Sequence, residues 1–155
     1  DDGSLLKKIH NYSGLPHRMH AFIDDHGRSI IDNGVATHPE PTTAALENLE
    51  GDVVLIAGGK DKGLSLQQLC RTCARCPRLY LHGEGGQRLA KECRSMGIEA
   101  LQFDNCRAAM EAALKSWIPG ETLLFSPTFS SYDEFRNFRD RARIFLSFCS
   151  SVPVG

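Results

Sequence analysis

The chain has 155 residues, of which 41% are hydrophobic and 24% charged, and its formal net charge is −1. These values predict one soluble globular domain and give no electrostatic argument for binding nucleic acid or a membrane surface. No apolar run approaches the roughly 20 residues of a membrane span. The chain begins Asp1-Asp-Gly-Ser4, without a signal peptide or an initiator Met, so we expect a piece of a longer protein. Its six cysteines do not form the pattern of a secreted disulfide scaffold, and the cytoplasm is the expected location.

The hydrophobic pattern predicts a β-hairpin followed by helices and strands in alternation. Pro39 and Pro41 fit the first turn of the first helix, with Thr37 or His38 as its cap, and Gly97 ends a later helix. This order predicts an α/β fold: a Rossmann-like, mostly parallel, doubly wound sheet of about six strands with an N-terminal β-hairpin. We expect strands at residues 19–24, 28–32, 52–57, 78–82, 99–103 and 121–125, and helices at 39–49, 64–74, 87–95, 106–117 and from about 132 to 149.

Two glycine-rich turns follow predicted strands. In Gly58-Gly-Lys-Asp-Lys-Gly63, the glycines free backbone amides and two lysines add positive charge. This composition at the carboxyl end of a strand favours an anion site, with a charged surface turn as the alternative. The stretch lacks the spacing of a P-loop, and Gly83-Glu-Gly-Gly86 lacks that of a dinucleotide fingerprint. The second stretch therefore predicts only a turn before the next helix.

The stretch Ser126-Pro-Thr-Phe-Ser-Ser-Tyr-Asp-Glu-Phe-Arg-Asn-Phe138 predicts the end of a strand, a hydroxyl-rich loop and the start of an amphipathic helix. Ligands of open α/β sheets bind at the carboxyl ends of strands, where this loop would lie. Ser130 and Ser131 would place hydroxyls and free amides at a helix start, which suits a carboxylate or phosphate; the alternative is a helix cap. His17 and Arg18 are further candidates for phosphate, with a solvated basic pair as the alternative.

Three cysteines form the pattern C-x-x-C-x-x-C at Cys70, Cys73 and Cys76. This pattern could begin a zinc or iron–sulfur site, but on a helix the three positions drift around the axis. Buried small apolar side chains are therefore the expected role, and we expect no metal. The nearby candidates for a fourth ligand are His82, Cys93 and Cys106.

Taken together, these stretches resemble the C-terminal domain of the Mur ligases, most of all in the branch that adds glutamate to UDP-MurNAc-L-alanine. Residues 14–18 resemble the start of that domain, and Asp32–His38 resembles the family's Asn-Asp-Ser-Lys-Ala-Thr-Asn stretch. Residues 58–63 resemble its Gly-Gly-x-x-Lys loop, and residues 126–138 its Ser-Pro-x-x-x-Ser-x-Asp-x-Phe-x-Asn-Phe segment, the most specific of the four. The likeness runs from residue 12 to about residue 149.

The resemblance implies that residues 1–13 are the tail of a linker from a missing central domain and that residues 14–155 bind the amino acid. It implies an ATP-dependent amide ligase of peptidoglycan precursor synthesis. ATP phosphorylates the carboxylate of UDP-MurNAc-L-alanine, and the amine of glutamate attacks the acyl phosphate. The family's P-loop and Mg²⁺ ligands lie in the central domain. We therefore expect that ATP and Mg²⁺ serve the full-length enzyme, and that this chain alone is inactive.

The resemblance also assigns residues by position, with no catalytic residue and no metal ligand in this chain. The residues that would bind the α-carboxylate of glutamate are Thr37 and Lys62. Those that would bind its side-chain carboxylate are Ser131 and the backbone near Tyr132 and Phe138. On the ATP side, His17 and Arg18 would lie toward the phosphates, and Asp32 and Asn33 toward the nucleoside.

Two positions depart from the family's pattern. Val35 stands where the family has Lys, so one positive charge is missing, and Asp32-Asn33 reverses the Asn-Asp order. These departures leave open the amino acid and its enantiomer. They also admit a divergent paralogue or a non-catalytic ligand-binding domain of the same fold. The presence of Thr37 and Lys62, with Ser131, favours the ligase.

Overall fold

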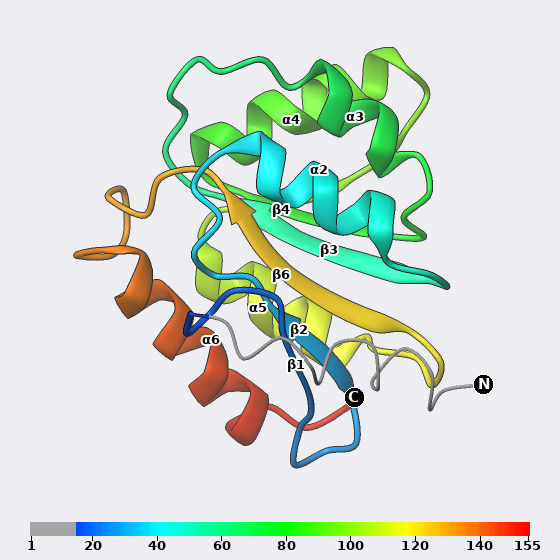
Figure 1. Cartoon of the computed structure of the whole chain (residues 1–155), viewed down its shortest axis with the longest axis vertical. Helices are drawn as coiled ribbons and strands as arrows, with labels where there is room; N and C mark the ends of the chain where they lie inside the picture. The colour runs from blue at the N-terminus through cyan, green and yellow to red at the C-terminus, as the bar shows by residue number, and fades with distance from the viewer. Residues whose placement is uncertain (1–14) are drawn as a thin grey trace.

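The computed structural model describes residues 15–155, which form a six-stranded sheet in the order β1-β2-β6-β3-β4-β5 (Figure 1). β1 (His20–Ile23) pairs antiparallel with β2 (Ser29–Asp32), and all other neighbouring strands are parallel. The predicted fold class and hairpin are therefore confirmed. The remaining strands are β3 (Val53–Gly58), β4 (Leu79–His82), β5 (Leu101–Phe103) and β6 (Thr122–Thr128). The helices are α2 (Pro39–Asn48), α3 (Gln67–Cys73), α4 (Gly83–Ser95), α5 (Cys106–Lys115) and α6 (Phe138–Ser151).

Two apolar layers hold the helices against the sheet. Helices α2, α3 and α4 cover one face through side chains such as Leu46, Leu69 and Leu89. Helices α5 and α6 cover the other face through side chains such as Met110 and Phe145. Every residue of the central strands β3 and β6 is buried, as their continuous apolar runs predict.

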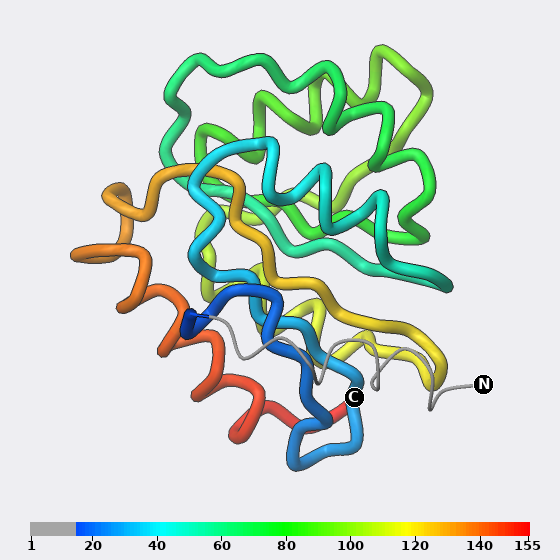
Figure 2. Tube along the Cα trace, viewed as in Figure 1, coloured from blue at the N-terminus to red at the C-terminus, as the bar shows by residue number. Residues whose placement is uncertain are grey.

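The loops that follow β2, β3 and β6 lie at the same edge of the sheet (Figure 2). The chain leaves β2 and β3 toward α2 and α3 on one face, but leaves β6 toward α6 on the other. A crevice forms at the carboxyl ends of parallel strands wherever neighbouring connections diverge in this way. The edge of the sheet beside β6 is therefore the place where this fold is expected to bind a ligand.

Strand β6 carries an irregularity at this end. Ile56 of β3 pairs with Phe125, whereas Gly58 pairs with Thr128, so two steps along β3 match three along β6. The extra residue makes a β-bulge. Pro127 lies within the bulge, where a proline is tolerated in a central strand because the ladder hydrogen bonding is already interrupted.

The expected helix start after β6 is wrong. The helix begins at Phe138 rather than near residue 132, and Tyr132 is 72% exposed within the preceding turn. The side chain of Asn137 caps α6 by accepting a hydrogen bond from the amide of Asp140. Tyr132 and Phe135 have helical spacing, but Phe135 is buried against the α5 side of the core from a non-helical segment. Consequently, the two serines before Tyr132 do not lie at a helix start.

The prediction of a separate turn at residues 83–86 is also wrong, because these residues form the first turn of α4. A Cβ at Gly85 would lie 2.4 Å from the Phe129 ring, and one at Gly86 would lie 3.1 Å from the Leu81 carbonyl carbon. The glycines therefore allow the helix to begin directly against β4 and β6. Two other helices are shorter than expected: α3 begins at Gln67, and α5 ends at Lys115.

Cys70, Cys73 and Cys93 are buried between α3 and α4, and 3.3 Å separates the sulfurs of Cys70 and Cys93. The expected burial of Cys70 and Cys73 is confirmed, whereas Cys76, the third cysteine of the pattern, is only partly buried. Burial raises the pKa of Cys70 to about 12, which keeps this thiol protonated at neutral pH. Residues 15–155 contain no group of three or more His, Cys, Asp or Glu side chains that could hold a metal ion. Within the same range, no helix has the length and apolar character needed to cross a membrane.

Candidate functional site

The loops after β3 and β6 are joined by backbone pairing between Lys60 and Ser130. The amide of Lys60 donates to the carbonyl of Ser130 at 2.9 Å, and the amide of Ser130 donates back at 3.2 Å. This pairing brings together the two stretches that the sequence singled out as separate anion sites. We refer to residues 58–63 and 129–132 together as the β3–β6 rim.

Two glycines allow the strands to approach this closely. Gly58 and Gly59 have φ values of +151° and +135°, which favour glycine. A Cβ at Gly58 would lie 2.2 Å from the carbonyl oxygen of His82, and one at Gly59 would lie 2.3 Å from the carbonyl oxygen of Ser130. The glycines are therefore required by backbone contact on both sides of β3.

Replacing Gly59 by alanine is expected to break the pairing of the rim. The control is Gly63→Ala, because Gly63 also has a positive φ of +72° but has nothing within 4 Å of its added Cβ. Both variants place a side chain at a positive φ, which is more strained at the +135° of Gly59, and only Gly59→Ala also adds a clash, which costs about 1–3 kcal/mol more. Thermal unfolding of both variants measures the difference. Equal losses of stability would show that the close contact with Ser130 is unimportant.

Lys62 is an exposed cation of the rim, as is Lys60, and its neighbour Asp61 anchors the loop. A carboxylate oxygen of Asp61 accepts from Arg88 at 2.9 Å and from the amide of Gly63 at 3.1 Å. Arg88 also donates to the carbonyl of Leu64 at 2.6 Å. Within residues 15–155, Lys62 has no ion-pair partner. Its charge is therefore available to a ligand on a loop that is otherwise fixed.

On the other side of the rim, Ser131 is 2% exposed and begins a tight turn. Its carbonyl oxygen accepts from the amides of Glu134 at 3.2 Å and Phe135 at 2.9 Å. This turn directs the side chain of Tyr132 outward, whereas Phe138 lies half-buried at the start of α6. The turn thus carries Ser131 and Tyr132 of the predicted glutamate group at the rim, directly after the residue that pairs with Lys60.

The residues predicted to lie toward the ATP phosphates and nucleoside also come together, at the end of β2. The Nδ1 atom of His17 lies 2.7 Å from Oδ2 of Asp32, whose other oxygen accepts from the amide of Gly34 at 2.9 Å. Arg18 is exposed beside this pair. Asp32 is fully buried, so its carboxylate serves first to hold His17 and the loop.

Asn33 and Thr37 make further contacts within the loop after β2. Asn33 is 2% exposed; its oxygen accepts from the amide of Met19 at 3.2 Å, and its amide donates to Ser126 at 3.0 Å. Thr37 is partly exposed, and its hydroxyl lies 3.1 Å from Nδ1 of His38. The side-chain oxygen and nitrogen of Asn33 are therefore both hydrogen-bonded within the protein, whereas Thr37 remains accessible to a ligand at the carboxyl edge of the sheet.

Comparison with known proteins gives a family for this arrangement. The family described as "Mur ligase, glutamate ligase domain" matches residues 17–129. The chain belongs to the Mur ligase family. A curated relative from Latilactobacillus sakei, UDP-N-acetylmuramoylalanine–D-glutamate ligase, is 30% identical over 145 residues, which cover 92% of this chain and 32% of the relative. The chain thus spans about a third of the length of the curated relatives that it matches.

Two solved structures show the same fold as this Mur ligase domain. UDP-N-acetylmuramate-alanine ligase MurC from Thermotoga maritima has a TM-score of 0.61 at 16% identity, with 92% of this chain and 32% of that chain covered. A bifunctional folylpolyglutamate synthase/dihydrofolate synthase with Mn, AMPPNP and L-glutamate bound has a TM-score of 0.59 at 17% identity, with 88% and 32% covered. The predicted fold agrees with both.

Glu134 secures the rim turn of this Mur ligase domain to its neighbours. Its carboxylate accepts from the amide of Cys106 at 2.8 and 3.0 Å, at the start of α5. It also lies 3.5 Å from Nδ1 of the buried His82. Burial pushes the pKa of Glu134 upward, but His82 and the Cys106 amide outweigh it, so the net pKa is lowered.

Replacing Glu134 by glutamine is expected to cost about 1 kcal/mol at pH 7, because an ionised acceptor is lost at a helix start. Since folding lowers this pKa, the stabilisation is present above the ordinary value of 4.5 and is lost as the pH falls through the folded value. Urea unfolding of wild type and Glu134→Gln between pH 7 and pH 3 should therefore converge at low pH. Glu99→Gln, at an exposed position, is the control. A difference that does not change with pH would contradict this role.

The residue that the sequence analysis missed is Arg141, which is fully buried in α6. Its guanidinium donates to the carbonyl of Phe129 at 2.9 Å and lies 3.5 Å from that of Gly58. It therefore holds the ends of β3 and β6, under the rim. One signal was available: Arg141 shares a helical face with Phe145 and Cys149, which are four and eight residues later.

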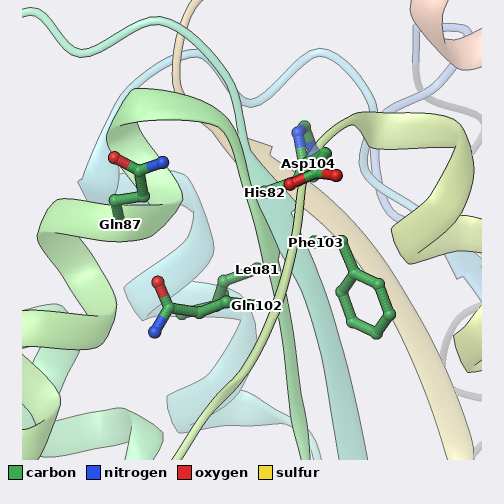
Figure 3. Close-up of a pocket in the computed structure, with 6 residues that line it drawn as sticks. All are labelled: Leu81, His82, Gln87, Gln102, Phe103 and Asp104. Atoms are coloured by element: carbon green, nitrogen blue, oxygen red, sulfur yellow. The ribbon is translucent and has the colours of Figure 1, made fainter.

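A pocket lies next to the rim, between the carboxyl ends of β4 and β5 (Figure 3); the carbonyl of His82, one of its lining residues, accepts from the amide of Gly59 at 3.3 Å. Figure 3 shows Gln87 on α4, His82 at the end of β4 and Asp104 directly after β5 among the residues that line this space. None of the predicted substrate or ATP residues lines it; its lining residues are Leu81, His82, Gln87, Gln102, Phe103 and Asp104. This pocket is therefore not formed by the predicted site residues.

Proposed function

We propose that residues 14–155 form the amino-acid-binding C-terminal domain of an ATP-dependent ligase that adds glutamate to UDP-MurNAc-L-alanine in the cytoplasm. Residues 1–13, which together with Gly14 lie outside the described residues, would link it to a central domain. The reaction joins the carboxylate of the UDP-sugar substrate to the amine of glutamate. ATP supplies the phosphoryl group that turns this carboxylate into an acyl phosphate, and the amine then displaces phosphate.

The observation that supports this proposal is the pairing of Lys60 with Ser130, which brings the loops that carry Lys62 and Ser131 side by side. Lys62 offers a cation, and Ser131 offers a hydroxyl and neighbouring backbone amides. A dicarboxylate needs two separated seats of this kind, because each carboxylate requires its own charged or hydrogen-bonding donors. We assign the α-carboxylate to Lys62 and Thr37, and the side-chain carboxylate to Ser131 with the backbone of Tyr132 and Phe138.

The ATP side of the proposal rests on the end of β2. An exposed Arg18 suits phosphate oxygens, and the adjacent His17 is oriented by the buried Asp32. The side-chain oxygen of Asn33 is bonded to Met19 and its side-chain nitrogen to Ser126, so Asn33 would hold the loop beside the nucleoside. The full-length enzyme would use Mg²⁺ with ATP, but we assign no Mg²⁺ ligand to residues 15–155, where no suitable cluster occurs.

The test uses the full-length protein with UDP-MurNAc-L-alanine, ATP and either D- or L-glutamate. We expect ADP release and a new amide product that depend on glutamate. The curated relatives are named as D-glutamate ligases, so the D enantiomer is the expected substrate. Activity with another amino acid but neither glutamate would overturn the proposed substrate, and no amide formation with any amino acid would overturn the proposed reaction.

A further inference from the structure

Thr128 ends β6 in an unusual backbone conformation, with φ of +73°. A β-branched residue is a genuine outlier in this left-handed region and persists only where its surroundings hold it. Thr128 closes the bulge that contains Pro127, and it is 1% exposed. The left-handed backbone of Thr128 must therefore be held by the contacts that this residue makes.

Three hydrogen bonds fix Thr128. Its amide donates to the carbonyl of Ala36 at 2.9 Å, in the loop after β2. Its hydroxyl lies 2.8 Å from the hydroxyl of Thr42 on α2 and 3.1 Å from the carbonyl of Ser126. These contacts come from two other elements and from β6 itself, so they determine the backbone of Thr128 from several directions.

The contacts continue through a buried chain of polar side chains. The hydroxyls of Thr42 and Ser126 are 2.6 Å apart, and Ser126 accepts from the amide of Asn33 at 3.0 Å. We call Asn33, Ser126, Thr42 and Thr128 the hydroxyl chain; their exposures are 2%, 0%, 0% and 1%. Because buried polar groups rigidify a structure when all are bonded, this chain ties the loop after β2 to the end of β6.

The backbone turn at Thr128 determines where the next residues go. The carbonyl of Phe129 meets Arg141 at 2.9 Å, and Ser130 pairs with Lys60. We propose that Thr128 is a positioning residue for the β3–β6 rim. The hydroxyl chain holds its left-handed conformation, and this conformation presents Ser130 to Lys60 and Ser131 to a bound amino acid. The substrate part of this inference rests on the proposed function, whereas the effect on the rim does not.

The test compares Thr128→Val and Thr128→Ser in the full-length protein. Valine keeps the shape and the backbone strain but removes the hydroxyl, whereas serine keeps the hydroxyl. Thr128→Val removes both hydrogen bonds of the hydroxyl, and we expect it to raise the KM for glutamate at least about ten-fold, with a smaller effect on kcat. Thr128→Ser should stay within about two-fold of wild type. Thr42→Val, which breaks the hydroxyl chain from α2 without changing a residue of β6, should behave like Thr128→Val.

The matched control is Thr43→Val. Thr43 is the neighbour of Thr42 and is also buried, but its hydroxyl bonds only to Pro39 in its own helix at 3.0 Å. It should leave the KM for glutamate unchanged. Equal effects of Thr43→Val and Thr128→Val, or no effect of the latter, would overturn the inference.

A second readout needs no activity. Hydrogen exchange at the amides of Lys60 and Ser130 should become at least ten-fold faster in Thr128→Val and in Thr42→Val, but not in Thr43→Val. If wild type does not use glutamate, the proposed function fails, yet the exchange rates still decide the positioning role. If Thr128→Val does not fold, Thr42→Val provides the same comparison. Unchanged exchange at both amides would reject the role of Thr128.

Discussion

Replacing Lys62 by alanine in the full-length ligase is expected to raise the KM for glutamate about ten- to a hundred-fold and to leave the KM for ATP nearly unchanged. Lys62 lies on a loop fixed by the Asp61–Arg88 ion pair, and among residues 15–155 it has no ion-pair partner of its own. A charge-assisted hydrogen bond to a substrate carboxylate contributes roughly 1.5–3 kcal/mol, which corresponds to this range of KM. Steady-state kinetics with glutamate varied at saturating ATP measure it.

The result can be separated from a general charge effect. Lys91→Ala removes an exposed lysine from α4, away from the rim, and should leave both KM values unchanged. Ser131→Ala should raise the KM for glutamate less than Lys62→Ala, because a neutral hydroxyl contributes only about 1 kcal/mol and the backbone amides remain. A glutamate KM that is unchanged in Lys62→Ala, or a larger effect of Ser131→Ala, would show that the two carboxylate seats are wrongly assigned.

Val35 bears directly on the effect expected for Lys62→Ala. The family's pattern has Lys there, so this chain offers one cation fewer beside Thr37. Lys60 is the other lysine of the rim, and its backbone is already fixed by Ser130. If Lys60 supplies the missing charge, the double variant Lys60→Ala, Lys62→Ala should lose more glutamate-binding free energy than the two single variants lose in sum.

The alternation of apolar runs and helical periods was sufficient to predict the sheet and its helices. A run such as residues 52–57 admits few structures other than a strand buried on both faces, and β3 is buried throughout. The error after β6 has a physical cause. Tyr132 and Phe135 satisfy the helical spacing, but the turn around Ser131 and the cap at Asn137 compete with a helix there, and local periodicity does not register that competition.

The rim was predictable only in part. Its glycines and lysines are visible as a stretch, but the pairing of Lys60 with Ser130 depends on a strand order that brings β3 beside β6. The same order explains why Thr42 and Ser126, 84 residues apart, share a hydrogen bond. Such partners are set by tertiary packing, so neither residue is distinguished in the sequence from an ordinary threonine of a helix or serine of a loop.

Replacing Arg141 by methionine is expected to give the largest loss of stability, about 2–4 kcal/mol. Methionine keeps an unbranched apolar stem, but the carbonyl of Phe129 loses its donor at 2.9 Å and that of Gly58 loses its nearest cation. Burial lowers the pKa of Arg141 to about 10, so the guanidinium is still charged at neutral pH. Removing it therefore also takes away one of the positive charges near Asp133 and Glu134.

Thermal unfolding should show the loss as a midpoint lower by about 5–15 °C for a chain of this size. Arg143→Met is the matched control, because Arg143 lies on the exposed side of the same helix and should shift the midpoint little. Arg141→Lys keeps the charge but not the planar fork that reaches two carbonyls, so an intermediate loss is expected. Equal midpoints for Arg141→Met and Arg143→Met would mean that the ends of β3 and β6 are held by their backbone pairing alone, and Gly59→Ala would then become the more damaging change at the rim.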